Sequence, residues 1–142
     1  MTTTETEQAL EDSGWRKRGL PGFAGLIGPL WTKKENGGWA YGLLATQSHT
    51  NPAGLVHGGL VTTLLDHALS AVAWEAMDRR PCVTVSLDTQ FLSAARSGQF
   101  LEARGRVVRA TFSLIFLQGT IQVSESDIAT ASAILKVAGK EA

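Results

Sequence analysis

The chain has 142 residues, close to the length of one domain, and its 13 basic and 13 acidic residues give no formal net charge. This balance argues against non-specific nucleic-acid binding, and the one cysteine, Cys82, excludes an internal disulfide and every multi-cysteine zinc site. With 44% hydrophobic and 18% charged residues, the composition is typical of a globular protein rather than a disordered one.

The N-terminal residues are polar. We expect residues 1–20 to form a polar tail or a short outer helix, and residues 21–142 to form a single domain. Met1–Asp12 has no apolar stretch of the kind found in a signal peptide. The longest apolar region, Leu55–Trp74, carries Asp66 near its middle, which argues against a membrane span. The sequence therefore predicts a soluble, cytoplasmic protein without membrane or nucleic-acid partners.

Two strands are predicted after an irregular, glycine- and proline-rich segment at residues 19–29. They cover Leu30–Lys34 and Trp39–Thr46, with a turn at Asn36-Gly37-Gly38 between them. The composition of Gln47–Gly54 predicts a loop.

A long helix is predicted over Gly58–Met77, where apolar residues occur on nearly every face. A helix without a clear polar face is typically buried. Four strands follow, which we place at Val83–Phe91, Phe100–Arg109, Ser113–Val123 and Asp127–Val137. Their short connections favour antiparallel neighbours. The predicted fold class is α+β, with one long buried helix wrapped by a curved antiparallel sheet of about five to six strands.

The segment from His49 to Asp66 contains the main candidate functional residues. Gly58-Gly59 opens the helix, where free backbone N–H groups and the helix dipole suit an anion or a polarised carbonyl oxygen. Asn51, on the loop before it, offers a side-chain N–H donor, or alternatively forms an Asx turn before Pro52. A tight turn without a ligand is the alternative for the two glycines.

Asp66 lies mid-helix among apolar residues, where an ionised carboxylate is costly unless it is paired or functional. The structural alternative is a pair with His67, His49 or an arginine. Asp66 follows Gly58 by eight residues, which is roughly 12 Å of helix. If both groups act on one substrate atom, they must come from two chains related by a two-fold axis.

The run Asn51-Pro-Ala-Gly-Leu-Val-His57-Gly58-Gly59, with Asp66 seven residues after the second glycine, resembles hotdog-fold acyl-CoA thioesterases, most closely the PaaI-like branch of phenylacetic-acid degradation. The resemblance spans residues 22–137 and includes Val83–Leu87 and Phe91–Ala95. It implies a hotdog fold and thioester hydrolysis without a metal or a separate cofactor, since CoA is part of the substrate.

The resemblance also implies roles for single residues. Asp66 is the implied general base or nucleophile, and Thr84 the hydroxyl that orients water beside it. The Gly58 N–H and Asn51 polarise the thioester carbonyl from the partner subunit, while His57 supports their loop. Alternation along the strand places Thr84 on the face opposite Val83 and Val85.

Residues that contact the rest of the substrate are less specified. The candidates for substrate binding are Gly59, Arg109 and Ser113. Further candidates for binding the CoA phosphates are Arg79, Arg80 and Arg96. For each of these arginines, and for Arg109, the alternative is an ordinary solvated surface side chain. The chain departs from the family at Ala94, which is usually proline, and at the hairpin turn Ala110–Leu114. The apolar residues Leu60, Leu64, Trp74 and Phe91 are open to either a pocket or a core role.

We expect a homodimer at minimum, with a homotetramer as in relatives, and an acyl-CoA substrate whose acyl group the sequence does not specify. Two other functions stay open: a hotdog enoyl-CoA hydratase or dehydratase, and a non-catalytic acyl-CoA-binding protein.

Overall fold

The computed structural model describes residues 2–139, so residue 1 of the predicted tail and residues 140–142 of the predicted domain lie outside it. In chain order the elements are α1 (Thr3–Asp12), β1 (Arg16–Arg18), α2 (Gly22–Ile27), β2 (Leu30–Glu35), β3 (Gly38–Leu44), the 3-10 helix η1 (Gln47–His49), α3 (Gly58–Ala76), β4 (Cys82–Phe91), β5 (Phe100–Ala110), β6 (Leu114–Val123) and β7 (Ser126–Val137). One antiparallel sheet contains all seven strands in the order β1-β2-β3-β5-β6-β7-β4.

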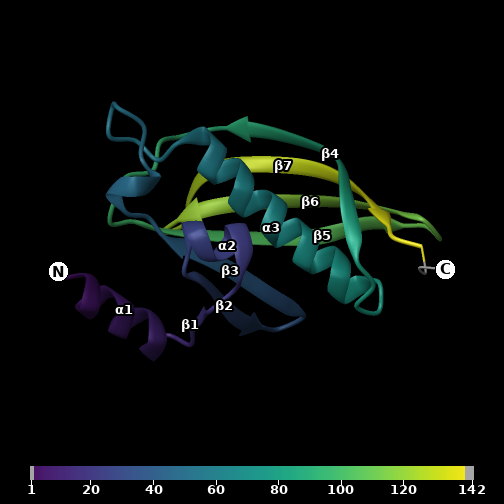
Figure 1. Ribbon diagram of the computed structural model, residues 1–142, viewed down its shortest axis with the longest axis horizontal. Helices are drawn as coiled ribbons and strands as arrows, with labels where there is room; N and C mark the ends of the chain where they lie inside the picture. Colours follow the sequence, from purple (N-terminus) through teal and green to yellow (C-terminus); the bar gives the residue numbers. More distant parts are fainter. Residues whose placement is uncertain (1, 140–142) are drawn as a thin grey trace.

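The α+β hotdog fold is confirmed: α3 lies across one face of the curved sheet and contacts strands β3 to β7 (Figure 1). The sheet has seven strands rather than five to six, because the basic segment Arg16–Arg18 pairs with β2. A short helix, α1, forms within the predicted tail. Its N-cap is Thr2, whose hydroxyl accepts a hydrogen bond from the Glu5 N–H at 3.1 Å.

The main core lies between α3 and the sheet, where Leu64, Leu65 and Leu69 are fully buried. Two glycines let the helix approach closely, because Gly105 and Gly119 face each other across β5 and β6. A Cβ atom at either position would lie 2.6 or 2.9 Å from Leu69 Cδ2. The sheet therefore holds a recess for one helical side chain.

A second, smaller core contains Trp15, Trp31 and Ala40, with Phe100 packed against it. The ring centroids of Trp15 and Phe100 are 4.8 Å apart in an edge-to-face arrangement. This contact joins the N-terminal segment to the sheet. Trp15 therefore packs against the sheet of the predicted domain.

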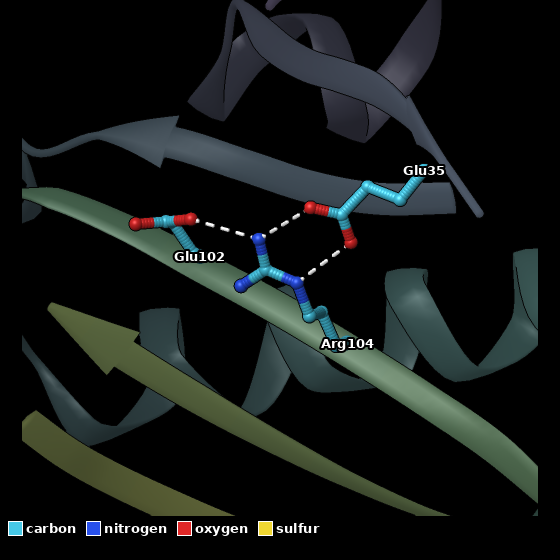
Figure 2. A network of polar contacts seen from close by, with 3 residues as sticks. All are labelled: Glu35, Glu102 and Arg104. Atoms are coloured by element: carbon cyan, nitrogen blue, oxygen red, sulfur yellow. Dashed lines mark hydrogen bonds and ion pairs between the residues drawn. The ribbon is translucent and has the colours of Figure 1, made fainter. Parts of the chain in front are cut away.

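Arg104 on β5 forms an ion pair with Glu35 at the end of β2, across the intervening strand β3 (Figure 2). Its Nε and Nη2 atoms each donate to one carboxylate oxygen of Glu35 at 2.8 Å, and Nη2 also donates to Glu102 at 3.0 Å. The bonds from Arg104 lower the pKa of Glu35, and the same bonds raise the pKa of Arg104. This ion-pair network stabilises the β2–β3 hairpin and lies apart from the residues predicted to carry chemistry.

The alternation predicted for β4 is wrong after Thr84. The register passes from Thr84 opposite Leu135 to Ser86 opposite Ile134, so Val85 is an extra residue in a β-bulge. The bulge shifts the side-chain phase, so that Thr84 and Leu87 both face α3. Val83 and Val85 are each 61% exposed in the single chain.

Candidate functional site

The N-terminus of α3 is capped by the residue directly before it. The His57 Nδ1 atom accepts a hydrogen bond from the Gly59 N–H at 2.8 Å, and the His57 N–H donates to the His49 carbonyl at 2.9 Å. The N–H of Gly59 is therefore used within the chain. By contrast, the Gly58 N–H has no acceptor within residues 2–139. Of the two glycines, it is Gly58 that presents an available donor.

Asn51 forms the Asx turn that the sequence left as an alternative. Its side-chain oxygen accepts from the N–H groups of Ala53 and Leu55, at 3.0 and 3.1 Å. Two donors at one end of the amide identify that end as the oxygen. The amide nitrogen is left without an acceptor in the described part of the chain. The turn therefore fixes the side chain and still presents an N–H donor.

Asp66 and Thr84 are joined by a short hydrogen bond between α3 and β4. The Thr84 Oγ1 atom donates to Asp66 Oδ1 at 2.6 Å, and both residues are half-buried. None of the ion pairs in the described residues includes Asp66, so the structural alternative, a pair with His67, His49 or an arginine, is not found there. The carboxylate is therefore held by one hydroxyl donor through one of its two oxygens.

A polar stripe on α3 surrounds Asp66, although the helix was predicted to have no clear polar face. The stripe consists of Thr63, Asp66, His67 and Ser70, at the spacing of one helical face. These four residues line a cavity of about 220 Å³. Its opposite wall is apolar and comes from α2 and the start of β2: Phe23, Ala24, Ile27 and Leu30. The spacing i, i+3, i+4, i+7 was the sequence signal for this stripe.

His67 lies beside Asp66 in this cavity. Burial lowers the pKa of His67, and the nearby charge of Asp66 opposes that effect only in part. The ring packs edge-to-face against Tyr41, with the centroids 5.9 Å apart. The cavity is thus bordered by an imidazole whose neutral form is favoured.

Within one chain, the structure brings the site residues together in two groups rather than one. Asn51, His57 and Gly58 lie at the N-terminal end of α3, next to the Phe91 ring, which lies 3.4 Å from the position of a Cβ atom on Gly58. Asp66 and Thr84 lie two helical turns further along, because α3 is continuous from Gly58 to Ala76.

The hairpin between β5 and β6 carries the two remaining predicted residues. Arg109 and Ser113 are both exposed, and the Ser113 carbonyl accepts from the Val137 N–H at 2.8 Å. Since Val137 pairs with Cys82, the hairpin lies at the end of the sheet where β4 begins. Neither residue forms a hydrogen bond or ion pair with Asp66 or Thr84.

The other candidate residues divide by position. Arg79 and Arg80 lie between α3 and β4, and Arg79 packs over the Trp74 ring at 5.2 Å. Arg96 lies at the opposite end of the helix, where its neighbour in an isolated β-bridge is Leu55. Leu60 and Leu64 are buried core residues, whereas Phe91 and Trp74 are exposed.

In residues 2–139, no group of three or more His, Cys, Asp or Glu residues is placed to hold a metal ion, and no helix is long and apolar enough to span a membrane.

Known proteins with similar sequences and structures include several thioesterases. The model of the thioesterase superfamily matches residues 53–129, more than half of the chain. A Pseudomonas aeruginosa protein, named as a candidate esterase, is 32% identical over 111 residues, which are 77% of this chain and 83% of that protein.

Two solved structures align with most of the fold. The first is a phenylacetic-acid-degradation-related protein of Ralstonia eutropha JMP134, described as a candidate thioesterase. It has a TM-score of 0.72 and 28% identity, and the alignment covers 83% of this chain and 91% of that one. The second is a Bacillus halodurans protein solved with CoA, with a TM-score of 0.65, 23% identity and coverage of 69% and 70%. From the matched family model and the P. aeruginosa relative, we conclude that this chain belongs to the thioesterase superfamily.

Proposed function

We propose that the protein hydrolyses acyl-CoA thioesters at a site shared by two copies of the chain. The observation that carries this proposal is the half-buried Asp66 carboxylate, held by Thr84 at 2.6 Å and bordering a cavity. A carboxylate fixed through one oxygen keeps the other free to act as a base or a nucleophile. Membership of the thioesterase superfamily supports this chemistry, and the CoA bound to the B. halodurans protein supports the substrate class.

In this mechanism the oxygen of a water molecule attacks the thioester carbonyl while Asp66 accepts a proton from that water. The negative charge that develops on the carbonyl oxygen is stabilised by the Gly58 N–H, the Asn51 amide and the α3 dipole. The C–S bond then breaks, and the CoA thiolate takes up a proton as the free acid is released. In the covalent alternative, Asp66 attacks the carbonyl itself, and water then hydrolyses the anhydride. Neither route uses a metal ion or a separate cofactor.

The edge strand β4 supports a shared site. β4 has a neighbour on one side only, β7, and its Val83 and Val85 side chains are 61% exposed. Gly58 lies beside Phe91 at the end of β4, and Asp66 lies beside Thr84 near its start. Antiparallel pairing of two β4 strands would therefore place Gly58 of one copy near Asp66 of the other. We propose this homodimer as the active unit and a homotetramer of two such dimers in solution.

The first experiment measures thiol release from short-, medium- and aromatic acyl-CoAs. We expect Asp66→Asn to lower kcat by about a hundred- to ten-thousand-fold, as for loss of a general base. The matched control is Asp12→Asn, an exposed aspartate at the end of α1 near the opposite border of the sheet from β4, which we expect to behave as wild type. Turnover that is equal in both variants would refute the role of Asp66.

Two other outcomes would point to the functions that the sequence left open. Acyl-CoA binding in the absence of turnover would indicate a binding protein. Loss of ultraviolet absorbance from an enoyl-CoA without thiol release would indicate a hydratase.

The oligomer is tested by Val85→Arg, because a charge on the exposed edge of β4 opposes pairing with a second copy. We expect sedimentation to give a mass below that of the wild type and thiol release to fall with it. Val108→Arg, on the half-exposed bulge of β5, is the matched control. An active monomeric wild-type protein would refute the shared site.

A further inference from the structure

We propose that His49 is the positioning residue for the two donors to the thioester carbonyl, the Asn51 amide and the Gly58 N–H. This inference rests on the proposed function, because the donors have a role only if a carbonyl group reacts beside them. It starts from three hydrogen bonds of His49, two made by the imidazole ring and one by the backbone carbonyl. They reach three different segments of the chain.

The imidazole ring of His49 uses both of its nitrogen atoms. Nδ1 accepts a hydrogen bond from the Thr46 N–H at 2.9 Å, just beyond the end of β3. A ring nitrogen that accepts carries no proton, so the proton of the neutral ring lies on Nε2. Nε2 therefore donates to the Ile27 carbonyl, which is 2.7 Å away and belongs to the last residue of α2. The half-buried ring thus joins the end of β3 to the end of α2.

The Ile27 carbonyl depends on His49 because it ends a helix. The last carbonyl groups of a helix have no donor within the helix itself. The next residues are Gly28 and Pro29, and a proline has no N–H group to offer. Within residues 2–139, the Ile27 carbonyl accepts from the His49 ring and from no backbone N–H. Loss of the ring would therefore leave this contact between α2 and the loop without a replacement.

The loop between His49 and His57 is closed at its base and braced inside. At the base, the His57 N–H donates to the His49 carbonyl at 2.9 Å. Inside the loop, the Asn51 N–H donates to the Leu55 carbonyl at 2.7 Å. These bonds fix the shape of the loop. They do not fix where the loop lies relative to α2 and the sheet.

Two anchors set the position of this loop. On one side, the Val56 N–H donates to the Ala95 carbonyl at 2.8 Å, in the connection between β4 and β5. On the other side, the anchor is the His49 ring. Asn51 follows His49 by two residues, and Gly58 directly follows the base of the loop, so a shift of the ring moves both donors. Loss of this anchor would displace the donors without removing either of them.

A displaced donor should affect the rate more than substrate binding. Removal of one donor to the developing negative charge costs about a hundred- to a thousand-fold in kcat, and an error of about 1 Å in position can cost about a hundredfold. We therefore expect His49→Phe, which keeps a ring and removes both nitrogen atoms, to lower kcat by about 10- to 100-fold. KM should stay within about threefold of wild type, because the lost stabilisation belongs to the transition state.

Two conservative variants separate the two bonds of the ring. In His49→Asn, the side-chain oxygen takes the place of Nδ1 and can accept from the Thr46 N–H, but the side chain is too short to reach Ile27. In His49→Gln, the amide nitrogen takes the place of Nε2 and can donate to the Ile27 carbonyl. Each variant keeps one bond, so we expect each to have a kcat between those of wild type and His49→Phe.

The assay is thiol release from one medium-chain acyl-CoA, with folding of each variant checked by circular dichroism. The matched control is Ser48→Ala. It removes an exposed hydrogen bond of 2.9 Å between Ser48 Oγ and Thr46 Oγ1 in the same turn, and it leaves the bonds of the His49 ring in place. We expect Ser48→Ala to have the kcat and KM of wild type.

Double variants show which group His49 acts through. If His49 positions Asn51, the loss of kcat in His49→Phe/Asn51→Ala should fall short of the product of the two single losses by at least about threefold. Thr84 instead orients Asp66, in the other group of site residues. His49→Phe combined with Thr84→Val should therefore give the product of the single losses within about twofold. A residue needed only for folding would not distinguish Asn51 from Thr84.

The outcomes separate this inference from the proposed function. Wild-type kcat in His49→Phe, a loss confined to KM, or equal behaviour of the two double variants would overturn the positioning role while Asp66→Asn still lacks turnover. If His49→Phe does not fold, His49→Asn and His49→Gln decide, and wild-type kcat in both would overturn the role. Absence of thiol release from the wild-type protein would overturn both proposals together.

Discussion

The bond between Thr84 and Asp66 gives the sharpest quantitative prediction. Replacing Thr84 by valine keeps the shape of the side chain and its β-branch but removes the hydroxyl that donates to Asp66 Oδ1 at 2.6 Å. The carboxylate would then have no protein donor among the described residues, while remaining half-buried beside the cavity. The orientation of the Asp66 carboxylate would then no longer be fixed, nor would the position of the oxygen that faces the substrate.

The magnitude follows from the charge of the acceptor. A hydrogen bond to an ionised group contributes about 1.5–3 kcal/mol, and about 1.4 kcal/mol corresponds to a factor of ten in rate. We therefore expect Thr84→Val to lower kcat/KM by about 10- to 150-fold. Thr84→Ser keeps the hydroxyl and loses one methyl group, so its kcat/KM should stay within about fivefold of wild type.

The assay is thiol release from octanoyl-CoA under conditions where both variants are folded, as checked by circular dichroism. The reasoning would be refuted by a Thr84→Val enzyme that is as active as Thr84→Ser. Equal losses in both variants would likewise exclude the hydroxyl as the cause, because only one of them lacks it.

Three further predictions concern stability. His57→Ala removes the cap on the Gly59 N–H and should cost about 1 kcal/mol in urea unfolding, whereas His57→Asn, which also caps, should cost less; equal losses would contradict the capping role. Because burial lowers the pKa of His67, the unfolded chain binds more protons than the folded one between that lowered value and about 6.5. Stability should therefore fall as the pH drops through this window, and His67→Phe should have a flatter dependence of Tm on pH; a slope as steep as that of wild type would refute this. Arg104→Lys loses the two-point bond to Glu35 and should lower the free energy of unfolding by about 0.5 kcal/mol, a small amount because the network is partly exposed. The loss should be smaller in 1 M salt, and an effect independent of salt would argue against an ionic origin.

The main elements of the fold could be predicted because each carries a local pattern. β2, β3, α3 and β4–β7 were located to within three residues at either end from apolar periodicity and turn residues. β1 could not be predicted, since its three residues are all basic and it forms by pairing with β2 beside the buried Trp15. α2 was missed because Pro21, Gly22 and Gly25 within so short a segment are typical of a loop.

The candidate site could be predicted as residues but not as an arrangement. The structure places Thr84 and Asp66 in contact, whereas the roles that the family resemblance implies for them stay predictions. The bulge at Val85 has no signature in the sequence, since a strand with an extra residue has the same composition as one without it. The apolar wall over Asp66 was missed along with α2, because residues about forty positions apart come together only through tertiary packing.

The two borders of the sheet are unequal, and this limits how large an assembly strand pairing can build. At one border, β1 is three residues long and fully basic, and α1 lies beyond it (Figure 1). The other border is the ten-residue β4. A subunit with a single usable border can join one other subunit, after which no unpaired strand is left to continue the array. Growth into a filament by strand addition is therefore stopped at two chains, and any larger assembly must form through the faces of the sheet or through its helices.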